Sequence, residues 1–454
     1  MHDPMTFEAR LADAFERYVA LAPTAANASA VAAAAADARQ SRRASGQSSR
    51  RAVVLALAAA LVVALIAGAA LVIGHLLQAP PLPHPRAYTN QFAAQPNLGL
   101  SRIDPIIIAL PDGRVLVAGG QIAFGDLREI SVELYDPGTG TSTSIATGGP
   151  SGWGNAVLLP DGQVFAIVLD TNMTSSCAFL IDPVRGTSRR LAAPDCAAPV
   201  FGVSPGVALL RDGRVLLTGG KHDYFDTNVI KTAYIYDPAS GEFLETGSMS
   251  VARVDQAVAT LPDGRVLVAG GGRLGPIPFD PEAALQVAFD DTAEVWDPRR
   301  GTFSDVADLG ISGPMRSVAL ADGSILLYPV EGDWAARSIA GGVQTGPVTT
   351  RVFDPFSNTF YAGPSLPAGI HGAVLLDDGR VLLTGQTLID LDTAHYVSWA
   401  VVWKPGDTFP TPIDAPPSGL GGNARLPDGR VFFAGGVSGF QNQGNRTTTV
   451  LTFE

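Results

Sequence analysis

The chain has 454 residues, of which 46% are hydrophobic and only 16% are charged, and its formal net charge is −12. The 50 Gly and 34 Pro indicate many tight turns and argue against long helical bundles. The acidic balance argues against a nucleic-acid partner, because phosphate binding needs clustered Lys and Arg. Only Lys221, Lys231 and Lys404 are lysines, a bias typical of GC-rich bacterial coding sequences.

Residues 1–51 predict a cytoplasmic segment made of one amphipathic helix and a basic linker. Phe7, Leu11, Phe15 and Val19 recur at four-residue spacing. Seven Arg stand against five acidic residues here, a balance of +2, whereas the rest of the chain carries −14. The segment either lies on the inner membrane face or docks to a cytoplasmic partner.

Residues 52–77 contain no Asp, Glu, Lys or Arg, and the run is long enough to cross a bilayer as one helix. Four Arg lie between positions 42 and 51, whereas the first Arg after the run is Arg86. The positive-inside rule therefore predicts a single-pass protein of the cell membrane with a cytoplasmic N-terminus. A long signal peptide cleaved near 78–80 is the alternative. Residues 78–87 form a Pro-rich, extended stalk.

Seven Asp-Gly pairs, each between two apolar runs, divide the rest of the chain. Their intervals are 49, 51, 51, 59, 56 and 50 residues, close to the length of one four-stranded propeller blade. Each pair predicts a hairpin with a two-residue turn. The fold class is therefore all-β, a seven-bladed propeller over 88–454. The pairs start at Asp112, Asp161, Asp212, Asp263, Asp322, Asp378 and Asp428.

Each repeat continues with a third strand that ends on a large side chain before a Pro-containing turn, and then a fourth strand. The large third-strand residues are Tyr135, Ile181, Tyr236, Trp296, Phe353 and Trp403. The aromatic residues assigned to the fourth strand are Phe243, Phe303, Phe360 and Phe409. Both sets are expected to fill the space between blades.

Gly-Gly doublets follow the second strand at 119–120, 219–220, 270–271 and 435–436. Half a doublet remains at Gly385, and the second and fifth repeats have none. With the aromatic third and fourth strands, this pattern resembles the kelch repeat family. The resemblance implies the propeller fold and says almost nothing about activity.

The seventh repeat reaches the end of the chain without a fourth strand. An open ring would leave a strand edge bare. Residues 88–100 precede the first repeat, and we expect them to supply the missing outer strand.

Four loops between second and third strands are long and belong to consecutive repeats: 221–229, 272–292, 331–347 and 386–396. Loops of unequal length on a rigid scaffold are where binding sites tend to be built. They mix carboxylates with aromatic residues and predict a contiguous binding surface. The candidate ligand-binding residues are His222, Asp223, Tyr224, Asp226, Phe279, Asp280, Asp290, Asp333, Trp334, Arg337, Asp392 and His395.

The axial mouth, where the innermost strands begin, offers few catalytic groups. The residues expected there are Pro105, Gly154, Pro205, Gln256, Met315, His371 and Gly421, with Arg253 and Arg316 close by. Convergent acids, bases or Arg clamps are not evident. No catalytic residue is assigned.

No metal site and no cofactor are predicted. The six His show no metal-binding spacing, and no calcium loop occurs. Kelch-like copper oxidases need two His, two Tyr and a modified Cys. His371, His395, Tyr396 and Tyr224 could serve in such a site, but no motif identifies them.

Cys177 and Cys196 flank the hairpin at Asp182-Pro183 in the second repeat. A disulfide between them would staple this hairpin in an oxidising compartment, adding roughly 3 kcal/mol. A reactive thiol is the alternative.

These observations predict a membrane-anchored extracytoplasmic binding or scaffold protein that presents a kelch propeller to a protein or glycan ligand. The alternative is a carbohydrate-active enzyme, which would gather perturbed carboxylates with Tyr, His or Arg in one pocket. A structural envelope component without a discrete ligand is the third possibility.

Overall fold

The computed structural model describes residues 90–122, 132–146, 154–169, 176–191, 204–221, 229–274, 287–330, 347–390, 395–416, 421–438, 443–444 and 446–453. The helices expected within 1–51 and 52–77 and the stalk at 78–87 lie outside these residues. Among the residues that are described, no helix is long and apolar enough to cross a membrane. The chain divides into two compact units, Met1–Pro85 and Arg86–Glu454.

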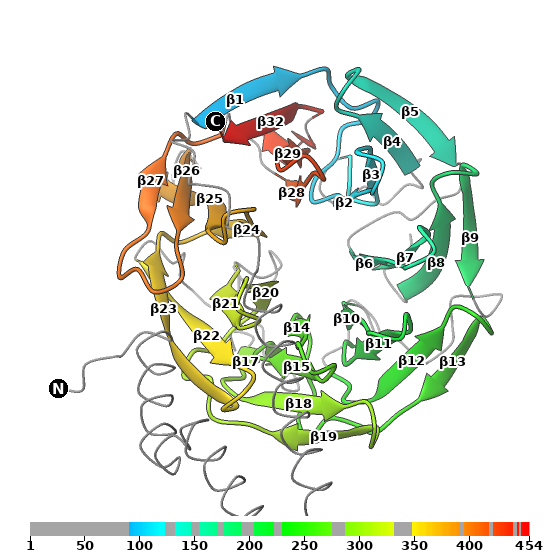
Figure 1. The fold of residues 1–454 in the computed structure, drawn as a ribbon, viewed down its shortest axis with the longest axis vertical. Coiled ribbons are helices and arrows are strands. Elements are labelled where there is room, and N and C mark those ends of the chain that lie inside the picture. Colours follow the sequence, from blue (N-terminus) through cyan, green and yellow to red (C-terminus); the bar gives the residue numbers. More distant parts are fainter. Residues whose placement is uncertain are drawn as a thin grey trace, which may run out of the picture. The chain divides into compact units, whose positions relative to one another are not determined.

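Seven four-stranded antiparallel sheets are arranged around one axis, which confirms the all-β seven-bladed propeller (Figure 1). Blade 1 contains β2 (Ile106–Ala109), β3 (Val115–Ala118), β4 (Val132–Asp136) and β5 (Thr141–Ala146). Blade 2 contains β6 (Gly154–Leu158), β7 (Val164–Leu169), β8 (Ser176–Asp182) and β9 (Thr187–Leu191). Blade 3 contains β10 (Gly206–Leu209), β11 (Val215–Thr218), β12 (Ala233–Asp237) and β13 (Glu242–Glu245). Blade 4 contains β14 (Ala257–Thr260), β15 (Val266–Ala269), β18 (Ala293–Asp297) and β19 (Thr302–Asp305).

Blade 5 contains β20 (Met315–Ala319), β21 (Ile325–Pro329), β22 (Val348–Asp354) and β23 (Thr359–Leu366). Blade 6 contains β24 (Ile370–Leu375), β25 (Val381–Asp390), β26 (His395–Trp403) and β27 (Thr411–Ile413). Blade 7 contains β28 (Gly422–Arg425), β29 (Val431–Ala434), β32 (Thr448–Phe453) and β1 (Asn90–Gln95). Two small hairpins join β16 (Gly272–Leu274) to β17 (Val287–Phe289), and β30 (Val437–Ser438) to β31 (Gln443–Gly444).

The ring closes through β1, which lies within the segment 88–100 and is the outer strand of blade 7. It pairs antiparallel with β32, from Asn90 opposite Phe453 to Gln95 opposite Thr448. Just beyond this ladder, the Thr448 hydroxyl donates to the Pro96 carbonyl at 2.7 Å. The first and last strands of the propeller are therefore hydrogen-bonded neighbours.

The antiparallel ladders define two faces of the propeller. The turns between first and second strands and between third and fourth strands end on one face, which we call the turn face. The connections between second and third strands, and the starts of the inner strands, lie on the other, the loop face. Because Asn90 pairs with Phe453 at the end of a third strand, the chain enters the propeller at the turn face.

The Asp-Gly turns have three-residue loops rather than the expected two-residue ones. In blade 1 the Gly113 amide donates to the Leu110 carbonyl, and the Leu110 amide donates to the Arg114 carbonyl. Only the Gly has a positive φ, 88° at Gly113, whereas none of the seven Asp does. This geometry is a type I turn with a Gly bulge. The Asp112 carboxylate instead accepts the Arg114 amide at 3.0 Å.

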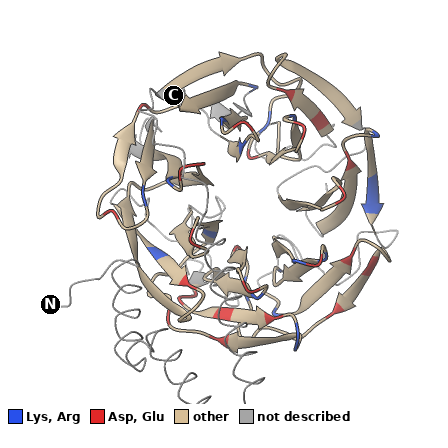
Figure 2. Cartoon of the chain, viewed as in Figure 1, with Lys and Arg blue, Asp and Glu red and all other residues tan. Residues whose placement is uncertain are grey.

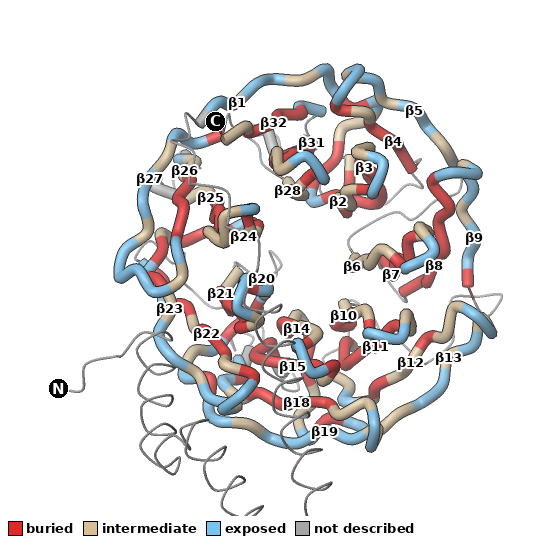
Figure 3. The backbone as a smooth tube through the Cα atoms, viewed as in Figure 1, coloured by how far each residue is buried: buried red, intermediate tan, exposed pale blue. Residues whose placement is uncertain are grey.

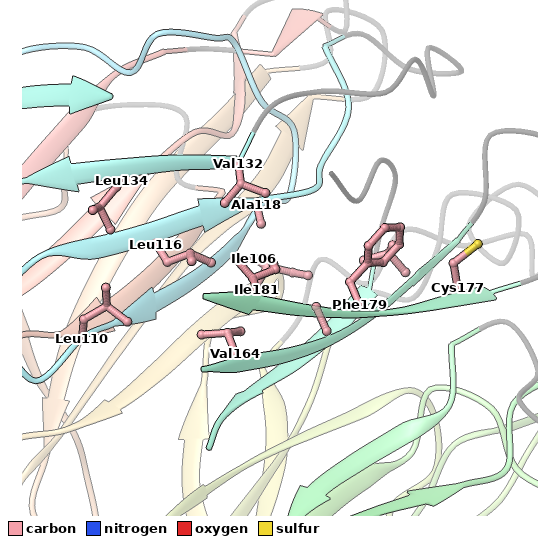
Figure 4. Packing of buried hydrophobic residues seen from close by; sticks show 12 residues of the cluster. Ile106, Leu110, Leu116, Ala118, Val132, Leu134, Val164, Cys177, Phe179 and Ile181 are labelled. Atoms are coloured by element: carbon pink, nitrogen blue, oxygen red, sulfur yellow. The ribbon is translucent and has the colours of Figure 1, made fainter. Parts of the chain in front are cut away.

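The core lies between neighbouring blades, where apolar side chains of adjacent sheets pack together. Figure 3 shows buried residues along the strands of each blade. Figure 4 shows Leu116 and Val132 of blade 1 facing Val164 and Ile181 of blade 2. The expectation for the large third-strand residues is confirmed, because Tyr135, Ile181, Tyr236, Trp296, Phe353 and Trp403 are all buried.

One expected core aromatic lies on the surface. Phe409 precedes β27 and is 78% exposed. The Asp407 amide donates to the Lys404 carbonyl, and the Trp403 indole donates to the Asp407 carbonyl at 2.9 Å. Trp403 therefore stands six residues before Phe409, whereas Trp296 stands seven before Phe303, and the aromatic ring misses the inward-facing position.

Blades 1 and 4 each contain a buried Arg–Glu ion pair that no other blade repeats among the described residues. Arg102 lies 2.8 Å from Glu133, and Arg253 lies 3.3 Å from Glu294. Both Arg side chains are fully buried. Burial lowers the pKa of Arg102, and the Glu133 charge partly offsets that effect. Each Glu also accepts amides from the preceding link between blades, such as Gly99 at 2.6 Å and Ser250 at 2.7 Å.

Candidate functional site

Most of the residues proposed for the loop-face surface lie outside the described residues. These are His222, Asp223, Tyr224, Asp226, Phe279, Asp280, Asp333, Trp334, Arg337 and Asp392. His395 is described only through its backbone, which begins β26 opposite Asp390. Asp290 is the one candidate whose side chain is placed.

Asp290 is buried and belongs to the ionic cluster of blade 4. Its carboxylate lies 3.3 Å from the Arg253 guanidinium, and both side chains are almost fully buried. It also accepts the Thr292 amide at 2.8 Å and the Thr292 hydroxyl. A carboxylate held in this way supports the blade and does not face a ligand on the surface.

The axial mouth is better described and divides its polar residues into two groups. Arg253 and Gln256 are buried, and the Gln256 amide donates to the Thr218 carbonyl at 2.7 Å. Arg316 and His371 are exposed at the loop-face ends of β20 and β24. These inner strands belong to blades 5 and 6 and lie side by side (Figure 1).

A β-bulge presents His371. Ile370 pairs with Gly385 and Gly372 pairs with Thr384, so His371 is the extra residue of β24. Bulges re-aim side chains and are common beside functional sites. The sequence alone shows the His but not the bulge, because the register shift depends on how β24 pairs with β25.

Arg316 lies opposite Tyr328 in the β20–β21 ladder. Tyr328 is buried, and this burial raises its pKa to about 12, although the charge of Arg316 opposes the rise. Tyr328 belongs to the same core cluster as Ile370 and Leu383 of blade 6. This neutral phenol therefore lies in the core that the two blades share, beneath Arg316. The sequence analysis did not single it out.

Arg316 and His371 make the mouth donor-rich at blades 5 and 6, whereas Asp104 and Asp255 stand two residues before β2 and β14. Arg316 supplies a permanent guanidinium, and His371 can donate or accept a proton. The seven inner strands contain no Asp or Glu within their bounds. A pair of carboxylates, as glycoside hydrolysis usually requires, is therefore not provided by these strands.

The described residues do not fit a copper centre of the kind that kelch-like oxidases carry. They contain no group of three or more His, Cys, Asp or Glu that could hold a metal ion. Cys177 is disulfide-bonded, so its sulfur is not a free thiol. The other cysteine, Cys196, lies outside the described residues, as does Tyr224. We therefore assign no step to a metal.

Comparison with known proteins gave limited sequence matches. No family model matches the chain. Two galactose oxidase sequences of Gibberella zeae, one from strain PH-1, are each 26% identical to it over 238 residues. The match covers 46% of this chain and 32% of each relative, so the chain spans about a third of their length.

Among solved structures, a fungal alcohol oxidase of the AA5 family, in complex with copper, aligns with a TM-score of 0.44 and 13% identity. The alignment covers 80% of this chain and 92% of that chain.

The expectation of a binding or scaffold protein for a protein or glycan ligand is wrong. The curated relatives that the sequence matches are both galactose oxidases, which are enzymes. The prediction failed because the propeller pattern reports the scaffold, whereas activity resides in a few side chains that the repeats do not encode.

Proposed function

We propose that the protein is a carbohydrate-active enzyme that binds a sugar or a related polyhydroxylated alcohol at the loop-face mouth of blades 5 and 6. The sequence match to galactose oxidases is the observation that carries this proposal. The match favours oxidation of a sugar hydroxyl, with dioxygen as the electron acceptor, over hydrolysis.

In this proposal Arg316 and His371 bind and orient the substrate. The guanidinium donates hydrogen bonds to hydroxyl oxygens, and the imidazole accepts a proton from a hydroxyl or donates one. Beneath them Tyr328 packs in the core shared by blades 5 and 6. Residues 331–346 and 391–394 connect the second and third strands of the same two blades in the sequence, and Trp334, Arg337 and Asp392 among them lie outside the described residues.

The test is a substrate screen with the purified full chain. Monosaccharides, oligosaccharides and simple alcohols are supplied with and without added Cu²⁺, and after chelator treatment. Oxygen consumption, hydrogen peroxide and new reducing ends are measured. We expect oxidation of at least one sugar or alcohol. Failure to convert any substrate under all of these conditions overturns the proposal.

Substitutions locate the site. Arg316→Ala and His371→Ala should each lower kcat/KM at least about tenfold, which corresponds to about 1.4 kcal/mol of transition-state stabilisation. Arg300→Ala is the matched control, because Arg300 is 80% exposed on the turn face. Equal activity in all three variants would place the substrate elsewhere on the propeller.

We also propose that residues 52–77 anchor the protein in the cell membrane and that the propeller is extracytoplasmic. The apolar run and its flanking Arg residues support this topology. The disulfide at Cys177 suits an oxidising compartment. Protease added to intact cells should digest the propeller and spare residues 1–51, and protection of the propeller would contradict the topology.

A further inference from the structure

Opposite charges occupy neighbouring outer strands at the rim of the propeller. β9 of blade 2 contains the exposed residues Arg189 and Arg190, which we call the basic strip. β13 of blade 3 contains the exposed residues Glu242 and Glu245, which we call the acidic strip. The other five outer strands contain one charged residue between them, Asp305 of β19. Figure 2 shows the blue of β9 and the red of β13 close together on the rim.

The two strips have no counter-charge within the propeller. Among the ion pairs of the described residues, none includes a residue of either strip. Arg190 donates to the sulfur of Cys177 at 3.2 Å, but this disulfide sulfur carries no charge. At the inner turns, in contrast, Asp212 pairs with Arg214 at 2.7 Å. The charges of the strips are therefore available to a partner.

Contacts between blades 2 and 3 hold the two strips next to each other. Leu191, at the end of β9, belongs to the same core cluster as Tyr236 and Phe243 of blade 3. The rings of Phe165 and Tyr236 stack with their centroids 4.9 Å apart. Burial raises the pKa of Tyr236, and the charge of Arg189 opposes that rise across the boundary between the blades. Figure 1 shows β9 and β13 following one another along the rim.

Neighbouring strips of opposite charge are complementary to a rotated copy of themselves. A two-fold axis parallel to the propeller axis, placed at the rim between β9 and β13, brings β9 of each copy opposite β13 of the other. Each basic strip then faces an acidic strip, twice in one dimer. A two-fold axis tangential to the rim brings β9 opposite β9 instead, where like charges repel. The charge pattern therefore selects the first arrangement.

The strands that carry the strips can also contact another strand. β9 and β13 are the last strands of their sheets, and Leu244, between the two Glu of the acidic strip, is 52% exposed. Charges on an edge strand usually block pairing between sheets, because a second copy brings the same charge. Here the second copy brings the opposite charge, so the same residues favour association.

We infer that the rim of blades 2 and 3 is a homodimer interface, in which the basic strip of each copy contacts the acidic strip of the other. This inference depends neither on the proposed enzymatic activity nor on the proposed membrane topology. The rim is convex, so the contact area is small, and exposed ion pairs each contribute little. The dimer is therefore weak and sensitive to salt. Both loop faces point to the same side, so the two axial mouths stay open.

The first experiment measures self-association of the purified full chain, kept in one mild detergent, by sedimentation velocity over a range of protein concentrations. We expect the dimer dissociation constant to rise at least about tenfold between about 0.1 M and about 1 M NaCl, because the Debye length falls from about 10 Å to about 3 Å. A chain that stays monomeric at the lower salt concentration overturns the inference. Association that is unchanged or stronger at the higher concentration overturns it too.

Charge reversal tests the pairing of the strips. One variant combines Arg189→Glu with Arg190→Glu, and the other combines Glu242→Arg with Glu245→Arg. Each variant alone should stay monomeric, because like charges then face one another. An equimolar mixture of the two should form a heterodimer, because every strip again meets its opposite. A mixture that stays monomeric contradicts the inference, and restored association shows that both variants are folded.

Asp407→Arg with Asp414→Arg is the matched control. Both residues are exposed and flank β27 of blade 6, on the opposite side of the ring (Figure 1). This variant changes the net charge as much as reversal of the acidic strip, yet its dissociation constant should stay within about twofold of the unsubstituted chain, because distant exposed charges are screened. Equal loss of association would show that net charge governs it. Species larger than a dimer would rule out the two-fold interface, which closes on itself.

Discussion

Blades 4 and 6 fill the same internal position with different chemistry. In blade 4 the Arg253 guanidinium donates to the Gly270 carbonyl at 3.0 Å and pairs with Glu294. In blade 6 the Trp399 indole lies against Gly385, and its Nε1 donates to the Ala368 carbonyl at 3.1 Å. An ion pair and an aromatic ring therefore serve the same architectural purpose, which is to tie the preceding link between blades to the third strand.

The ion pair of blade 4 and the Trp399 ring of blade 6 require different surroundings. A buried cation needs its carboxylate, because an unpaired charge in the interior is costly. An aromatic ring needs space, and the missing Cβ of Gly385 provides it, since a Cβ there would lie 2.4 Å from the Trp399 ring. Blade 4 should therefore be sensitive to loss of charge, and blade 6 to loss of volume.

The largest effect is expected from Glu294→Ala in blade 4. It leaves the buried Arg253 with Asp290 as its remaining carboxylate, removes the acceptor of the Ser250 amide, and should lower the free energy of unfolding by about 3–5 kcal/mol. Urea denaturation measures the change. Glu242→Ala, at an exposed position of β13, is the control and should cost less than about 0.5 kcal/mol. A loss at Glu294 no greater than in this control would show that the ion pair is dispensable.

Trp399→Ala in blade 6 should cost less, about 2–3 kcal/mol, because the ring is only partly buried. Thermal unfolding of this variant and of Glu294→Ala should rank them in that order. If Trp399→Ala lowers the unfolding temperature more than Glu294→Ala, packing contributes more to the stability of this fold than the ion pair does.

The triple variant Arg253→Met with Glu294→Leu and Asp290→Asn separates the ionic cluster from its parts, because Asp290 is a second buried carboxylate on Arg253. Replacing buried charges with uncharged side chains of similar volume is often close to neutral, so the triple variant should lose less than about 2 kcal/mol. Its urea midpoint should lie above that of Glu294→Ala. A midpoint below that of the single variant would mean that the ion pair itself stabilises blade 4.

Substitutions in the Asp-Gly turns should lower the stability of blades 4 and 6 equally. Gly264 of blade 4 has φ 90° and Gly379 of blade 6 has φ 81°. A Cβ at either position meets only ordinary contacts, so Gly264→Ala and Gly379→Ala should each cost about 1–2 kcal/mol through backbone strain alone. Calorimetry should find the two costs alike, and a marked difference would reveal a packing contribution.

The smallest expected effect is a loss of stability of blade 1 at low pH. Blade 1 resembles blade 4 in having a buried ion pair. The Arg114 side chain lowers the pKa of Asp112, and the Gly138 amide lowers that of Asp136. A depressed carboxyl pKa contributes stability that is present above the unfolded value of about 3.9 and is lost as pH falls toward the folded value. Hydrogen-exchange protection factors in β4, which correct for the intrinsic pH dependence of exchange, should fall below about pH 4 before those in β26 of blade 6 change.

Much of the ring could be predicted from sequence because its signals are local. The Asp-Gly repeats give the blade number, and the large residue before each Pro-containing turn gives the third strand. Phe409 shows where prediction from local sequence patterns fails. The spacing from Trp403 to Phe409 is one residue shorter than in the other repeats, which the sequence shows, but only the structure shows that the ring lies on the surface as a result.

The site was harder to predict because its groups meet across blades. Arg316, Tyr328 and His371 come from three strands of two blades, and the bulge that exposes His371 exists only in the paired sheet. Asp290 was assigned to the surface on residue type. Its carboxylate turned inward because Arg253, almost 40 positions earlier, needs a counter-charge. An ion pair between residues that are far apart in the sequence produces no repeating pattern, so a single sequence does not predict it.

The pairing of Asn90 with Phe453 has a consequence for how the molecule is assembled. The ribosome makes β32, the partner of β1, after all the other strands of the propeller, so the ring stays open until then, and deletion of Thr448–Phe453 would leave β1 without a partner. The same adjacency makes circular permutation feasible. A short linker between Phe453 and Asn90, with new termini between two other blades, should yield a propeller in which β32 and β1 are joined covalently.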